Sequence, residues 1–162
     1  DAAITLYDPR PDPLSEPLWG LPDPDTHGDF YEATAMKRFV AWIVDTILIL
    51  LISLVAIPFT AFIGLFFFAV LFLIVSFVYR TATIASWSAT PGMRLMGIEF
   101  RNARGERFDS VTAAAHTMLY LIMMSVFVLQ AVSILLMLVS ARGQGLHDHL
   151  LGTAAINRAR AL

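Results

Sequence analysis

An aspartate inside a long apolar run is the first residue of this sequence whose type and position could do chemistry. Asp45 is the only formally charged residue among the forty-one from Phe39 to Tyr79. A charge at the centre of a lipid bilayer costs at least about 2.5 kcal/mol on insertion scales, so such residues are rare and usually functional. Asp45 could tie helices together as a hydrogen-bond acceptor, carry a proton or cation, or contact a lipid or another subunit. We favour the structural interpretation.

Arg38 precedes Asp45 by seven residues, which is two turns of a helix. The two side chains therefore share one face and are separated by about 10.5 Å along the axis. Side chains lean toward the amino end of a helix, which tilts Asp45 toward Arg38 without bringing them into contact. Asp45 needs another partner, and His116 is the intramembrane candidate.

The segment "HDH" at residues 147–149 offers imidazole and carboxylate groups, which are common metal ligands. His147 and His149 would alternate in any extended segment, however, and the chain has no cysteine. The sequence also contains no GxSxG nucleophile elbow and no glycine-rich phosphate loop. We therefore predict no metal site, no cofactor and no enzymatic activity.

The composition indicates an integral membrane protein. Hydrophobic residues make up 57% of the 162 residues and charged residues 15%, and the mean hydropathy is +0.70. A soluble domain has about 45–50% apolar and about 25% charged residues. A spanning helix needs about 20 residues, so the first apolar run predicts a hairpin of helices at about 38–57 and 62–81. The turn is expected at "PFTAFIG".

Beyond this hairpin we expect a small β-hairpin-like loop and a third apolar segment. In residues 82–112, "GIEF" and "RFDSV" flank the turn-rich "RNARGE", which predicts a short hairpin on the membrane surface. The third block, Ala113–Ser140, is long enough for one tilted span, or it could turn back as a re-entrant hairpin. In the second case "TAAIN" near the carboxyl end could pair with "GIEF", and we lean toward this arrangement. The predicted fold class is an all-α membrane protein.

Basic residues predict the orientation, because loops rich in Lys and Arg stay in the cytoplasm. Lys37, Arg38 and the five arginines of residues 80–112 fall on one side of the helical hairpin. That side, and the N-terminus with it, is expected to be cytoplasmic.

The N-terminal residues form an acidic, proline-rich arm. Residues 1–30 hold six of the eight prolines, and residues 1–36 hold eight of the thirteen acidic residues. Prolines favour extended or irregular backbone. We therefore divide the chain into an arm at 1–35 and a membrane domain at 36–162. The arm either folds back on its own membrane domain or docks on another subunit, and its candidate anchors are Tyr7, Leu14, Leu18, Trp19 and Leu21.

Four features in order resemble the RDD family of bacterial membrane proteins: Arg38, Asp45, "TPGMRLMG" and "QGLHDHLLGT". The resemblance covers about residues 36–157. It implies a set of motif residues, namely Arg38, Asp45, Thr90, Pro91, Gly92, Arg94, Gly97, His147, Asp148, Gly152 and Thr153. The family commonly has a lysine where Met93 stands and an arginine where His116 stands. The resemblance implies a fold and a location in the bacterial cytoplasmic (inner) membrane, rather than a particular activity.

The expected function is that of an accessory or assembly subunit of a larger membrane complex. Its expected partners are membrane lipid and other membrane-protein subunits, and no nucleic acid. The alternative is a small transporter that moves protons or cations through Asp45. One carboxylate makes a thin pathway, and the domain is too small to offer inverted repeats around a midplane site.

Overall fold

The computed structural model describes residues 20–158, and the structural statements below concern that part of the chain. A short 3-10 turn, η2, covers Gly28–Phe30. The elements that follow are α1 (Thr34–Phe59), α2 (Ile63–Phe66), α3 (Phe68–Trp87), α4 (Pro91–Leu95), β1 (Ile98–Arg101), α5 (Ser110–Ser125), α6 (Phe127–Val139), α7 (Leu146–Leu151) and β2 (Ala154–Asn157).

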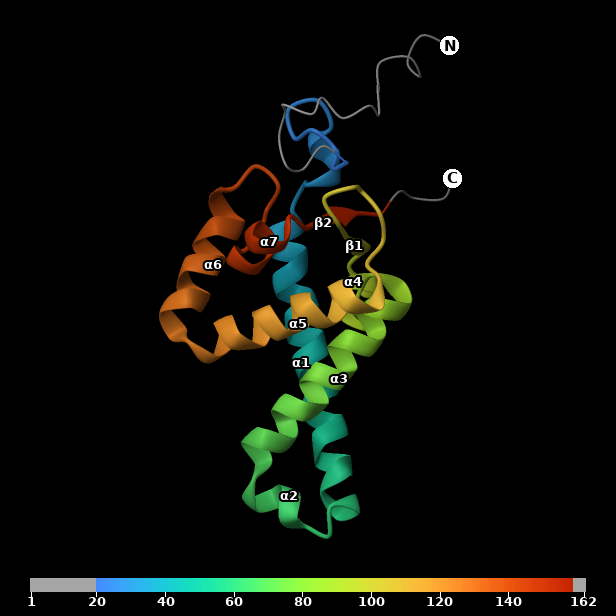
Figure 1. Ribbon diagram of the computed structural model, residues 1–162, viewed down its shortest axis with the longest axis vertical. Coiled ribbons are helices and arrows are strands. Elements are labelled where there is room, and N and C mark those ends of the chain that lie inside the picture. Colours follow the sequence, from blue (N-terminus) through green and yellow to red (C-terminus); the bar gives the residue numbers. More distant parts are fainter. Residues whose placement is uncertain (1–19, 159–162) are drawn as a thin grey trace.

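The predicted helical hairpin is confirmed by α1 and α3, which are both long and apolar enough to cross a membrane. The hairpin runs along the long axis of the molecule, and α2 lies at its tip (Figure 1). Ala61 and Phe62 have positive φ angles of 51° and 64°, a conformation that interrupts a helix. The second long helix begins at Phe68, after the short α2, and extends to Trp87, about six residues beyond the expected end.

The third apolar block is bent. Helices α5 and α6 meet at Val126 and are inclined by 117°. Asp109 caps α5 by accepting a hydrogen bond from the backbone N–H of Thr112 at 2.7 Å. In Figure 1, α5 crosses the hairpin and α6 rises beside it, so that α7 and β2 lie at the same end of the molecule as β1. The chain thus turns back, as the re-entrant alternative required.

The small antiparallel sheet is confirmed, but the local β-hairpin is wrong. Strand β1 pairs with β2, with Ile98 opposite Asn157 and Arg101 opposite Ala154. The segment "RFDSV" forms no strand, because its polar groups are used elsewhere: the N–H of Phe108 donates to Ser88 Oγ at 3.0 Å, and Asp109 caps α5. The partner of "GIEF" is therefore "AAIN", within the predicted "TAAIN".

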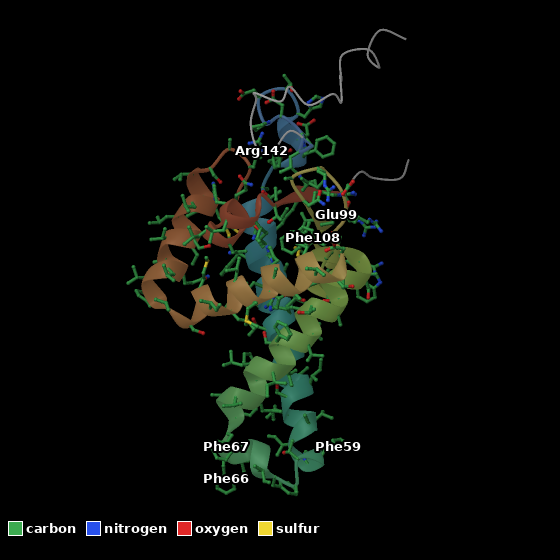
Figure 2. All side chains as sticks on the ribbon, viewed as in Figure 1. Phe59, Phe66, Phe67, Glu99, Phe108 and Arg142 are labelled. Carbon is green, nitrogen blue, oxygen red and sulfur yellow. The ribbon has the colours of Figure 1, made fainter. Side chains whose placement is uncertain are left out.

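The main core lies where the hairpin meets α4, α5 and the sheet. Phe100 and Phe108 stack there with their ring centroids 5.2 Å apart, between buried residues such as Ile84, Ile98 and Ala113. The opposite end of the hairpin is apolar but uncovered. Figure 2 shows Phe59, Phe66 and Phe67 projecting at that tip, where they are 87%, 84% and 63% exposed.

The described part of the N-terminal arm packs on its own membrane domain. Leu21 is only 4% exposed and lies in a cluster with Tyr31, Ala154 and Ile156. The Tyr31 hydroxyl donates to the carbonyl of Pro22 at 2.7 Å. From Leu21 onward the arm folds back, as one of the two alternatives predicted. The other four predicted anchors, Tyr7, Leu14, Leu18 and Trp19, lie outside the described residues.

Candidate functional site

Asp45 lies at the first of two buried polar clusters and accepts three hydrogen bonds. Its side chain is inside the bundle, with the residue 1% exposed. The donors are the Tyr79 hydroxyl at 2.9 Å, the backbone N–H of Gly92 at 2.9 Å, and the Thr90 hydroxyl. These groups come from α3 and from the start of α4, so one carboxylate connects three helices.

The "TPG" motif at residues 90–92 has a geometric reason in this cluster. Thr90 is the N-cap of α4 and accepts a hydrogen bond from the Met93 N–H at 3.2 Å, and Pro91 occupies the first helical position. A Cβ atom on Gly92 would lie 2.3 Å from the carbonyl oxygen of Ala41. Glycine therefore lets the backbone of α4 approach α1 closely enough for the Gly92 N–H to reach Asp45.

Asp148 is the centre of the second cluster. It is 0% exposed and makes an ion pair with Arg38, whose Nη1 lies 2.6 Å from its Oδ2. Its other donors are His116 Nε2 at 2.9 Å, the Thr153 hydroxyl at 3.0 Å and the Gly145 N–H at 3.0 Å. This cluster connects α1, α5 and α7 and the chain segment that enters β2.

Burial and the Arg38–Asp148 pair together determine which groups of this cluster are charged. Burial alone would raise the pKa of the Asp148 carboxyl, but the Arg38 guanidinium and the hydrogen bond from His116 hold that pKa well below its usual 3.8. Burial lowers the pKa of His147 to about 3, although Asp148 opposes the shift. His147 is therefore neutral. Its Nε2 lies 3.3 Å from Arg38 Nη2 and accepts from it, so the proton sits on Nδ1.

His116 is not the partner of Asp45, and that prediction is wrong. His116 donates to Asp148 instead, and hydroxyl and backbone groups fill the sites around Asp45. Together with His147 and Asp148, His116 places three possible metal-ligand atoms within 4.8 Å of one another. In this structure, however, the guanidinium of Arg38 supplies the positive charge beside these ligands. The carboxylate of Asp148 is therefore paired within an arginine–carboxylate–histidine network.

The remaining motif residues have separate roles. Arg94 lies outside both clusters, and its guanidinium stacks on the Trp87 ring at 4.6 Å. Gly152 ends α7 with a φ of 67°, in the left-handed conformation that favours glycine. Gly97 has a φ of 71°, and its carbonyl accepts from the Arg158 N–H at 2.8 Å beside the sheet.

Sequence reasoning missed several polar residues of the interior. Nothing in the sequence relates Tyr79 to Asp45, although its hydroxyl donates to that carboxylate. Glu99 is 5% exposed and pairs with Arg101, with Arg107 at 3.7 Å and with Arg158 at 3.6 Å. The cluster of arginines around it was the available signal.

A cavity of about 660 Å³ adjoins both clusters. One wall is α1, with Arg38, Trp42 and Asp45, and the opposite wall is α6, with Ile134 and Met137. Helices α3 and α5 contribute polar and aromatic groups that include Arg80, Thr117 and Tyr120. The Trp42 indole N–H donates to the Tyr120 hydroxyl at 2.8 Å, and the Arg80 guanidinium lies 4.7 Å from the centre of the Tyr120 ring.

Comparison with known proteins gives one match. A family model described as "RDD family" matches residues 32–152 of the chain, a range that contains both clusters. No curated protein and no solved structure matches.

Proposed function

The chain belongs to the RDD family, and we propose that it is a non-enzymatic accessory or assembly subunit of a larger membrane complex. Membership of this family implies a shared membrane fold rather than a particular activity. The observation that carries this proposal is the state of the two motif carboxylates. Asp45 has three intramolecular donors and Asp148 has four, one of them Arg38. Groups held this tightly connect helices, and they are poorly placed to act as bases or nucleophiles.

The tip of the helical hairpin offers a surface for such a complex. From Arg38 to Phe59 the chain advances twenty-one residues, or about 32 Å of helix, which is about the thickness of the hydrocarbon core. The tip therefore reaches the far side of the membrane. Membrane interfaces favour Trp and Tyr, which have a polar edge. The tip instead carries phenylalanines, of which Phe59 and Phe66 are more than 80% exposed, and these are suited to another apolar protein surface.

The orientation follows from the basic residues. Lys37 and Arg38 lie near the start of α1, and Arg101, Arg104 and Arg107 lie in β1 and the loop after it. Both groups belong to the end of the molecule opposite the α2 tip (Figure 1). By the positive-inside rule this end faces the cytoplasm, in a bacterial cytoplasmic membrane, and the phenylalanine tip faces outward.

A proton or cation transporter is the alternative. It is supported by one observation, which is that Asp45 borders the cavity between α1 and α6. Transport through Asp45 would require its donors to separate from it in each cycle. Flux of protons or cations into vesicles that depends on Asp45 would favour this alternative.

The test of the subunit proposal is the mass of the native assembly. We would tag the full chain, extract it from its own membranes in mild detergent, and measure the mass and stoichiometry of the particle. We expect a particle with a stoichiometric partner. The partner should be released by deleting residues 1–19 if it contacts the arm, and by changing Phe66 to serine if it contacts the hairpin tip. Comparing the two variants therefore shows which of these surfaces is the contact.

The matched control is Phe127→Ser. Phe127 is 85% exposed at the start of α6, away from the hairpin tip, so the change removes an equal apolar side chain from a different surface. We expect this variant to keep the partner. A chain that runs as a monomer in detergent, with no partner before any substitution, would contradict the proposal.

A further inference from the structure

The geometry points to a binding site for a single-chain, monoanionic amphiphile of the fatty-acid class in the cavity between α1 and α6. This inference does not depend on the subunit proposal, because it concerns a site inside one copy of the chain. It is carried by Arg80, by two other donors without a hydrogen-bond partner, and by the apolar lining of the same cavity.

Arg80 is the buried cation that lacks a negative partner. It is 9% exposed and lines the cavity. Within residues 20–158 its guanidinium forms no ion pair, and its Nε has no hydrogen-bond partner. Its contact is the face of the Tyr120 ring, at 4.7 Å. Asp45 borders the same cavity, but its oxygens are held by Tyr79, Thr90 and Gly92. A buried arginine is ordinarily paired with a negatively charged group, so the Arg80 guanidinium can pair with a bound anion.

Two further donors of the same cavity are also unsatisfied in the described chain. They are the Thr117 hydroxyl, on a residue that is 1% exposed, and the Nδ1–H of His147, on a residue that is 2% exposed. The Tyr120 hydroxyl accepts from Trp42, which leaves its own proton to donate. All of these groups are donors. An unsatisfied buried donor is costly, and an oxyanion is the ligand that would satisfy several donors together.

Apart from Gln130, the α6 side of the cavity is apolar. Its α6 wall presents Ile134, Met137 and Leu138, and Met124 of α5 adjoins them. Met and aliphatic side chains adapt to flexible hydrocarbon chains. An occupant that suits both walls therefore has an anionic end toward α3 and α5, and an alkyl body along α6.

Charge and volume define the occupant further. The second arginine of the cavity, Arg38, is already paired with Asp148, and the carboxylate of Asp45 is held by three neutral donors, so Arg80 is the cation of this cavity that is left to pair with an anion. One negative charge on the ligand balances it. The volume of about 660 Å³ lies within the range of about 300–1,000 Å³ that is usual for sites of small ligands. This volume suits one alkyl chain with a compact carboxylate better than a lipid with two chains.

The test uses Trp42, which lines the cavity, as a fluorescent reporter. The chain has three tryptophans, so the full chain with Trp19→Phe and Trp87→Phe keeps only Trp42. Bromine on an alkyl chain quenches a tryptophan that it touches. We would titrate brominated stearic acid into the protein in detergent, at a pH high enough to ionise the acid. We expect saturable quenching by the acid, and no saturable quenching by its methyl ester.

Substitutions then assign the head group to Arg80. Hydrogen bonds to charged groups are strong enough that Arg80→Gln should raise the acid concentration at half-saturation by about tenfold or more. Arg80→Lys keeps the charge and should retain most of the binding. Arg107→Gln is the matched control, because it removes one exposed arginine outside the cavity, and it should bind as the parent does. If Arg80→Gln does not fold, Thr117→Val should weaken binding by a few-fold.

Two results would overturn the inference. Equal quenching by acid and ester, unchanged by Arg80→Gln, would show that the cavity takes hydrocarbon without recognising an anion. Quenching by brominated phosphatidylglycerol in preference to the acid would show that the site takes a two-chain phosphodiester lipid.

Discussion

Replacing Asp45 by leucine and by asparagine tests the structural role of this carboxylate directly. Leucine removes every acceptor, while asparagine keeps one carbonyl oxygen and most of the shape. Both changes abolish the buried charge, so both relieve its desolvation to the same extent. The difference between the two variants therefore depends on the donors left behind.

The structure gives the magnitude. Of the three donors, the Thr90 hydroxyl and the Gly92 N–H belong to buried residues, and Tyr79 is half-buried. Each buried donor left unsatisfied costs about 1–3 kcal/mol, so Asp45→Leu should lose about 2–6 kcal/mol. Asparagine can still accept one of these bonds, without charge assistance. The leucine variant should thus be less stable than the asparagine variant by about 1–3 kcal/mol, which is a difference in Tm of about 2–12 °C for a chain of this size.

The assay is thermal unfolding of both variants in the same detergent, followed by circular dichroism and by size-exclusion chromatography. Ser53→Ala is the matched control on the same helix. Ser53 is 0% exposed, but its hydroxyl donates to the Ile49 carbonyl of its own helix at 2.8 Å, so its loss should have a small effect. An Asp45→Leu protein as stable as the asparagine variant would refute the structural interpretation. Loss of proton-coupled flux in both variants with undiminished stability would favour transport.

Three further predictions concern pH, packing and orientation. Burial lowers the pKa of His147 from 6.5 to about 3, so the unfolded chain binds a proton that the folded chain does not, and the stability that neutral His147 contributes is lost as the pH falls through this window. The free energy of unfolding should therefore fall by about 1.4 kcal/mol per pH unit between about pH 6 and about pH 4.5. His147→Gln should reduce this slope, and the control His149→Gln should keep it. A free energy of unfolding of the parent protein that does not change with pH in this range would contradict the assignment. Gly92→Ala should lower the free energy of unfolding by about 1–3 kcal/mol or more, because its Cβ would overlap the Ala41 carbonyl. The control is Gly28→Ala, whose Cβ meets nothing within 4 Å and which should be close to neutral in thermal unfolding. Equal stabilities of the two variants would count against the close approach of α4 to α1. Single cysteines at Ala33 and at Ala103 should resist an impermeant thiol reagent in intact cells and react in lysed cells, and labelling of either from outside would reverse the proposed orientation.

The sequence predicted those features that depend on local pattern. The run from Phe39 to Tyr79, whose only formal charge is Asp45, predicted the hairpin. The start of α5 was not predicted, because its N-cap Asp109 lies in "RFDSV", which the alternating pattern assigns to a strand. The partner of Asp45 could not be predicted in this way. His116 is an ionisable residue of the third apolar block, but the donors to Asp45 are a tyrosine hydroxyl, a threonine hydroxyl and a backbone N–H. The Gly92 N–H has no sequence signature at all, since its availability depends on how closely two helices approach.

The pairing of the strands depends on the course of the third apolar block, and it was predicted only for the re-entrant arrangement. "RFDSV" has the spacing of a hairpin partner for "GIEF", and it would have been the cheaper choice in loop entropy. It forms no strand because Ser88 and the start of α5 use its polar groups. The strand that takes its place arrives only after the third apolar block has turned back.

The bend of that block and the Arg38–Asp148 pair depend on each other. A straight helix over residues 110–139 would be about 45 Å long and would carry α7 to the far side of the membrane. Asp148 would then have no arginine, and Arg38 would remain on α1 without its carboxylate. Breaking a buried pair in this way costs about 3–5 kcal/mol, because it leaves an uncompensated charge. The 117° bend avoids that cost by returning Asp148 to within 2.6 Å of Arg38. The seven-residue spacing of Arg38 and Asp45 thus reflects two separate contacts of α1. The two side chains do not pair with each other. On one face of the helix, Arg38 binds Asp148 of α7, and two turns further along Asp45 accepts hydrogen bonds from the start of α4.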